Sequence, residues 1–121
     1  MAAHTLVIKS TTGATQPEKT NQAFTVATAA LAAGVEVSVW LTGESVYLAV
    51  PGRASDIALE HALEMEELVD IVLSEGTLTA CTQCVARRGL TQADLLPGVR
   101  IAGAPMFVEE IMADSVQALV Y

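Results

Sequence analysis

The chain has 121 residues, of which 52% are hydrophobic and only 4% aromatic. A chain of this length folds as one domain, which we place at residues 1–121. Such a domain buries roughly two thirds of its unfolded surface and needs no disulfide or metal ion to fold. The formal net charge of −8 argues against nucleic acid as a partner, because binding to phosphates depends on clustered Lys and Arg. A core of Ala, Val, Leu and Ile favours α/β layers over an aromatic-rich β-sandwich.

The sequence has no features of secretion or membrane insertion. Its start lacks a basic region, and the first apolar run is a short strand. The Ala-rich stretch 24–41 is interrupted by polar residues and by Gly34, so it does not resemble a membrane span. Two cysteines do not form a disulfide framework. We therefore expect a cytoplasmic protein that does not enter a membrane.

The first half of the chain alternates strand and helix signals. Residues 5–9 contain a continuous apolar run, as expected for a strand covered on both faces of a parallel sheet. After a polar loop, Pro17 suits the first turn of a helix that Gly34 ends. Valines alternate with polar residues within 35–41, which predicts a second strand, and residues 44–50 predict a short helical turn.

The second half continues the alternation. Its predicted elements are a long amphipathic helix or two shorter ones over 57–73, a buried strand ending at 78–80, a helix over 82–88, a strand over 99–102, a helix over 106–113 and a strand over 117–121. Thr91 and Asp94 also resemble a capping box. This order predicts an α/β fold: a three-layer α/β/α sandwich with a mainly parallel sheet of about five strands. A ligand site is expected at the carboxyl ends of the strands.

The two cysteines, Cys81 and Cys84, lie where a predicted strand passes into a predicted helix. Unpaired N–H groups and the macrodipole at a helix N-terminus stabilise an anion, which favours the nucleophilic thiolate. The alternative is that both cysteines are buried and behave as small hydrophobic residues. Their position at the junction favours a chemical role for Cys81.

Other residues near this junction have two possible roles each. Arg88 lies seven residues after Cys81, so it can share a helix face with both cysteines and lower a thiol pKa. It can instead complement the helix C-terminus, about 10 Å away along the axis. We take Arg88 and Thr82 as candidate binding residues. Trp40 and Tyr47 are either core or subunit-contact residues, or a wall of the cysteine pocket.

The segment Ala80-Cys81-x-x-Cys84-x-x-Arg87-Arg88-Gly89-Leu90 resembles the region around the active cysteine of the DsrE/DsrF-like family, sulfur-relay proteins that include the TusD-type subunits. The similarity extends over nearly the whole chain, from the first strand to the terminal Ala-Leu-Val-Tyr. In that family a cysteine eight residues before the glycine of the Arg-Gly pair carries persulfide sulfur. The resemblance therefore implies that Cys81 is the persulfide carrier. Cys84 matches a second cysteine of some members, a candidate resolving or accessory thiol.

The resemblance implies a sulfur carrier or sulfurtransferase that holds sulfane sulfur on Cys81 and passes it to a partner thiol. This chemistry needs an accessible thiol of low pKa and a partner surface, and no metal or cofactor. The C-x-x-C spacing leaves open a dithiol/disulfide redox protein, for which Pro105 is a candidate cis-proline. A third alternative is a non-catalytic oligomeric subunit. A metal site is not expected, because two cysteines supply half of a tetrahedral zinc site and neither histidine has ligand spacing.

The resemblance also implies partners. Relatives form trimers, hexamers and mixed complexes, so we expect a homo-oligomer, as well as protein sulfur donors and acceptors. Candidate contact residues in the turn after the second strand are Val46, Tyr47, Leu48 and Val50.

Overall fold

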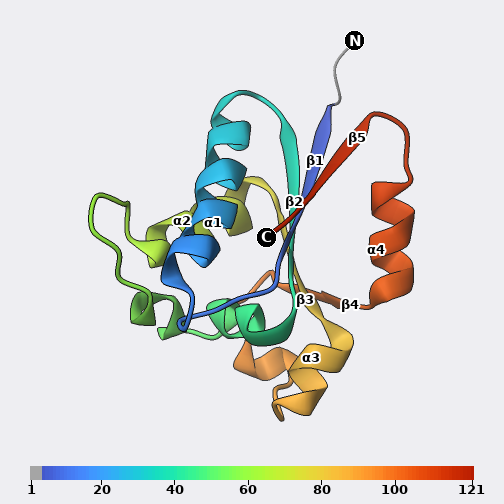
Figure 1. Ribbon diagram of the computed structural model, residues 1–121. Coiled ribbons are helices and arrows are strands. Elements are labelled where there is room, and N and C mark those ends of the chain that lie inside the picture. The colour runs from blue at the N-terminus through green and yellow to red at the C-terminus, as the bar shows by residue number, and fades with distance from the viewer. Residues whose placement is uncertain (1–3) are drawn as a thin grey trace.

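A single parallel sheet organises the computed structural model, which describes residues 4–121 (Figure 1). Its five strands lie in the order β4-β3-β2-β1-β5, and every neighbouring pair is parallel. The strands are β1 (Thr5–Ser10), β2 (Glu36–Leu41), β3 (Thr77–Cys81), β4 (Arg100–Ala102) and β5 (Val116–Val120). The predicted five-stranded parallel sheet is confirmed.

The helices cover both faces of this sheet. Helices α1 (Pro17–Ala32) and α2 (Met65–Glu75) pack together on one face, and α4 (Ala104–Ile111) lies against the other (Figure 1). The connections through α1 and α2 add strands in one direction, whereas the connection through α4 returns to the opposite edge beside β1. Right-handed crossovers therefore place α4 on the opposite face. The three-layer architecture is also confirmed.

Strand alternation divides the side chains between the two layers. Val37, Val39 and Leu41 of β2 are buried in the hydrophobic core beneath α1 and α2, with Ile8 and Leu78 of the flanking strands. Successive side chains of a strand point to opposite faces, so Ser38 and Trp40 project toward α4. The α4 face thus receives Ser38 and Trp40, both of which contact Glu110 of α4.

The predicted helix over 57–73 is wrong in its first half. Residues 57–64 contain turns and bends, His61 has a φ of 61°, and Leu63 is 62% exposed. Helix α2 begins only at Met65, whose side chain is buried. The apolar period continues through 57–64 in the sequence, but part of this segment packs against no core. Because helices are stabilised mainly by burial of an apolar face, the helix does not extend into this segment.

Three short 3₁₀ helices complete the connections: η1 (Gly43–Ala49), η2 (Arg53–Asp56) and η3 (Gln92–Asp94). Helix η1 confirms the predicted helical turn. The predicted capping box is present at η3, where the side chains of Thr91 and Asp94 pair reciprocally with the backbone. Among residues 4–121, none of the helices combines the length and apolarity that crossing a bilayer requires.

Candidate functional site

Cys81 is the last residue of β3 and the N-cap of α3 (Thr82–Arg87), so the predicted strand-to-helix junction is present. Its extended backbone, with φ of −65° and ψ of 127°, ends the strand and turns the chain into the helix. Cys81 is partly exposed, whereas Cys84 is buried on the first turn of α3. Only one of the two thiols is therefore open to a reactant.

The surroundings of Cys81 lower its pKa. Burial raises the pKa of this thiol, but hydrogen bonds from the Cys84 N–H, the Cys84 thiol and the Gln83 N–H, together with the charge of Lys9, outweigh that effect. Hydrogen bonds to the charged form of an acid favour that form. The Cys81 thiolate is therefore stabilised, and the thiolate is the nucleophilic state of cysteine.

Cys84 is held by the neighbouring connection. The Gly43 N–H donates a hydrogen bond of 3.2 Å to Cys84 Sγ, which ties α3 to the start of η1. The Cys84 thiol in turn supports the Cys81 thiolate. This arrangement places a second sulfur beside the first and in a buried position.

A small cavity of about 60 Å³ adjoins Cys81, and elements from four parts of the chain form it. Its lining residues are Lys9, Trp40, Thr42, Cys81, Ala104 and Phe107. The Trp40 and Phe107 rings meet edge to face, with centroids 5.3 Å apart, and Lys9 Nζ lies 5.1 Å from the Phe107 centroid. Trp40 has both of its predicted roles. It is a core residue, only 2% exposed, and it also forms a wall of the cysteine cavity.

Arg88 is bound to partners outside this cavity. It forms a salt bridge of 2.6 Å with Glu44 and donates a hydrogen bond of 3.1 Å to the Cys84 carbonyl. The second contact is that of a cation complementing a helix C-terminus. Thr82 lies near Gly103, where an added Cβ would come within 3.8 Å of Thr82 Oγ1. Neither residue lines the cavity, and a binding role for Arg88 or Thr82 stays a prediction.

The wall of the cavity is supported by a polar cluster on the α4 face. Glu110 of α4 accepts hydrogen bonds from Ser38 Oγ at 2.7 Å and from Trp40 Nε1 at 3.0 Å, and pairs with Arg100 of β4. Arg100 Nε also donates to Thr79 Oγ1 at 2.8 Å. One carboxylate thus joins α4 to β2 and β4, and it fixes the indole that borders the cavity.

Sequence reasoning missed Lys9, Thr42, Phe107 and Glu110. Lys9 carried a signal, because it is a charge at the carboxyl end of an otherwise apolar strand. Phe107 and Glu110 are three residues apart and so share a helix face, but nothing in the sequence says which face meets the sheet. The other residues needed the strand order before they could be placed.

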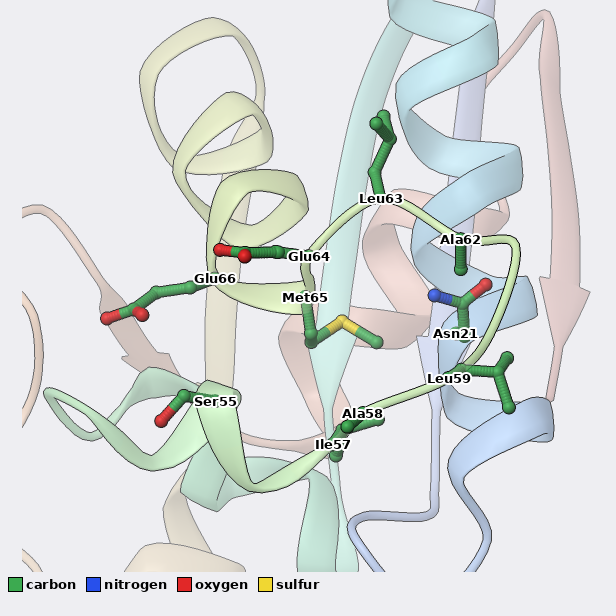
Figure 2. Close-up of a pocket in the computed structure, with 10 residues that line it drawn as sticks. All are labelled: Asn21, Ser55, Ile57, Ala58, Leu59, Ala62, Leu63, Glu64, Met65 and Glu66. Carbon is green, nitrogen blue, oxygen red and sulfur yellow. The ribbon is translucent and has the colours of Figure 1, made fainter.

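A larger cavity of about 260 Å³ lies elsewhere, beneath the 57–64 segment and between α1 and α2 (Figure 2). Figure 2 shows Asn21 of α1 and Met65 of α2 among its walls, with Leu59 and Leu63 on the connecting segment. No cysteine lines it.

Among residues 4–121, no three His, Cys, Asp or Glu side chains are grouped so that they could hold a metal ion. The peptide bond before Pro105 is trans.

The fold and the thiol at the carboxyl edge of its sheet define a parallel α/β protein with a cysteine-centred site. The model of the DsrE/DsrF-like family matches residues 4–119, and the chain therefore belongs to this family. Membership indicates a fold of the sulfur-relay type.

Two further comparisons concern individual proteins. An uncharacterized protein of Methanocaldococcus jannaschii is 28% identical over 113 residues; the match covers 93% of the chain but only 41% of that relative. The crystal structure of the ychN protein from E. coli superimposes with a TM-score of 0.78, 18% identity and full coverage of both chains. At this identity the second likeness establishes the fold.

Proposed function

We propose that this protein is a sulfur carrier that holds sulfane sulfur as a persulfide on Cys81 and passes it to a partner thiol. The observation that carries the proposal is the partly exposed Cys81 thiol, whose pKa is lowered and which borders a small cavity at the carboxyl edge of the sheet. Family membership supports the same chemistry.

The transfer is a pair of displacements without net oxidation. In loading, the Cys81 thiolate attacks the outer sulfur of a donor persulfide; the new S–S bond forms while the donor S–S bond breaks, and the donor leaves as a thiolate with the electron pair. With thiosulfate as donor the same displacement releases sulfite. In unloading, an acceptor thiolate attacks the outer sulfur and Cys81 is the leaving group. The hydrogen bonds that lower the Cys81 pKa favour its departure, because a thiol of lower pKa leaves faster.

The experiment is intact-protein mass spectrometry with peptide mapping after exposure to thiosulfate or a persulfidated carrier. We expect wild type and Cys84→Ser to gain the mass of one sulfur atom on Cys81. Cys81→Ser should gain none, because Cys84 is buried and its sulfur is held by Gly43. Undiminished sulfur uptake by folded Cys81→Ser would refute the carrier role.

A second candidate function is dithiol/disulfide exchange between Cys81 and Cys84. It is favoured by the Cys84 thiol, which lies close enough to support the Cys81 thiolate. The same mass spectra separate the two functions. Loss of the mass of two hydrogen atoms, requiring both cysteines and occurring without a sulfur adduct, would establish the redox couple in place of the carrier.

The proposal includes a homo-oligomer, a trimer or hexamer. It also includes protein sulfur donors and acceptors. We place the protein in a reducing compartment such as the cytoplasm, where thiols stay available. Two of the four predicted contact residues need correction, because Val46 and Leu48 are buried in the core, whereas Tyr47 and Val50 are partly exposed. More exposed apolar side chains occur on α4, at its C-cap and on β5. They are Met106, Val108, Met112, Leu119 and Val120. A cluster of such residues is typical of an interaction surface.

A further inference from the structure

Lys9 is the basic residue of the cysteine cavity. Among residues 4–121, three salt bridges are present, and all three use arginines: Arg53, Arg88 and Arg100. None of them involves Lys9, although this side chain is partly buried. A charge that leaves bulk water is normally paired, so a lysine at a thiol-lined cavity without a carboxylate partner raises the question of what anion it meets.

The sheet register explains how Lys9 reaches the cavity. Lys9 lies opposite Trp40 on the neighbouring strand, and Trp40 lies opposite Thr79, two residues before Cys81. All of these side chains share the α4 face, because strand alternation sends residues i and i+2 to one side. Arg100, on the β4 side of Trp40, is neutralised by Glu110. Lys9, on the β1 side of Trp40, lies instead over the Phe107 ring.

Phe107 holds the ammonium without neutralising it. A lysine over an aromatic face gains a cation–π attraction, which orients the group and leaves its positive charge available. Because Lys9 and Phe107 both line the cavity that Cys81 borders, this contact keeps the charge at the cavity wall. The cavity of about 60 Å³ has room for a small group attached to the cysteine.

We propose that Lys9 is the anion-binding residue of the Cys81 site, where its ammonium holds the anionic outer sulfur of the Cys81 persulfide and selects sulfur donors that are themselves anions. This role rests on the proposed carrier function for its sulfur chemistry. It assigns the substrate class as anionic persulfides or thiosulfate-like donors and disfavours neutral polysulfides.

Charge balance gives the physical reason. When the Cys81 thiolate attacks a donor persulfide anion, two negative charges meet; the products are the Cys81 persulfide anion and the donor thiolate, or sulfite where the donor is thiosulfate. The S–S bond formed replaces the S–S bond broken, and no electrons are gained or lost overall. A fixed cation reduces the repulsion between the two anions, and it acts most strongly where water is partly excluded.

The test uses two alkylating reagents of similar size, iodoacetate and iodoacetamide, on the full chain with Cys84→Ser as background. The measured quantity is the ratio of their rate constants at Cys81 at constant pH. Any change in the fraction of thiolate affects both reagents equally and cancels in the ratio. The ratio therefore reports the preference of the cavity for an anion.

We expect Lys9→Gln to lower the iodoacetate/iodoacetamide ratio by roughly three- to tenfold, as removal of one nearby charge at a partly exposed site does. Lys9→Arg should restore the ratio, and Lys19→Gln, which removes an exposed lysine of α1, should leave it unchanged. If Lys9→Gln does not fold, Lys9→Met replaces it, because its unbranched stem still covers Phe107.

An unchanged ratio in folded Lys9→Gln or Lys9→Met would overturn the anion-binding role, and so would an equal fall in Lys19→Gln. Alkylation requires no sulfur transfer, so this result is independent of the carrier proposal. Conversely, a lowered ratio in a protein that never gains sulfur would leave the anion site standing and remove the carrier function.

Discussion

At the scale of single residues, the site depends on which cation reaches the thiol. Arg88 was a plausible neighbour of Cys81 in the sequence, but its guanidinium is paired with Glu44 and bound to the Cys84 carbonyl. Lys9 comes from a strand more than seventy residues earlier and shares the cavity with Cys81. The local helix supplies N–H groups to the thiolate, and a distant strand supplies the charge.

Glu110 provides a prediction at this scale. Burial raises its pKa, but hydrogen bonds from Trp40, Arg100 and Ser38 and the charge of Arg100 outweigh that effect and lower the pKa. We expect Glu110→Gln to cost about 1.5–3 kcal/mol at neutral pH, the range for hydrogen bonds to a charged group. Urea denaturation measures this difference.

The pH dependence of that difference has a defined sign. Because the folded pKa lies below the ordinary glutamate pKa of 4.5, the carboxylate stabilises the fold above that pH and loses its contribution as pH falls through the folded pKa. Wild type should therefore lose its advantage over Glu110→Gln in acid. A gap between the two proteins that stays constant from neutral to acid pH would contradict this account.

At the scale of elements, β3 is positioned by the close approach of Gly76 to β2. Gly76 is the C-cap of α2, immediately before the strand that ends in Cys81. A Cβ added there would lie 2.7 Å from the Val37 carbonyl oxygen and 3.2 Å from the Val72 carbonyl oxygen. The strand can therefore leave the helix at this point only with glycine, unless the backbone shifts.

We expect Gly76→Ala to destabilise the protein by about 1–3 kcal/mol, as overpacking against a backbone does. The displaced β3 should also change the rate at which Cys81 is alkylated. Gly103→Ala is the matched control for stability, because its added Cβ meets its nearest neighbours at 3.7 Å and 3.8 Å, an ordinary contact. Equal urea midpoints for the two variants would show that the approach at Gly76 is not restrictive.

At the scale of the whole molecule, the α4–β5 unit is the least covered part of the fold. No residue of α4 is buried, and Val108, Met112 and Val120 are 52%, 76% and 67% exposed. A helix with this apolar composition and one polar anchor at Glu110 is suited to packing against a further subunit. The cysteine cavity lies at the same helix, through Ala104 and Phe107.

We expect size exclusion with light scattering to give a trimer or hexamer for wild type and smaller species for Met112→Asp, because a buried unpaired charge is costly at an interface. Leu63→Asp is the control, since Leu63 is also exposed but lies beside α1 and α2. A monomeric wild type, or dissociation by the control alone, would count against the proposed surface.

The alternation of apolar runs and helix signals was sufficient to predict the layers, the parallel sheet and the junction at Cys81. These features depend on the local period of apolar residues, on helix stops and on the burial of both sheet faces. All three can be recognised in short stretches of sequence. The same reasoning extended α2 to residue 57, since a period alone does not show where the core stops.

What the sequence determined by itself is thus the α/β class and the presence of a thiol at the carboxyl end of a strand. The tertiary structure decided that Lys9, Trp40 and Phe107 surround that thiol, that Arg88 is paired elsewhere, and that Glu110 braces the wall. The physical reason is strand order. Residues from β1, β2, β3 and α4 meet only after the sheet has placed distant segments side by side, and no local pattern encodes that order.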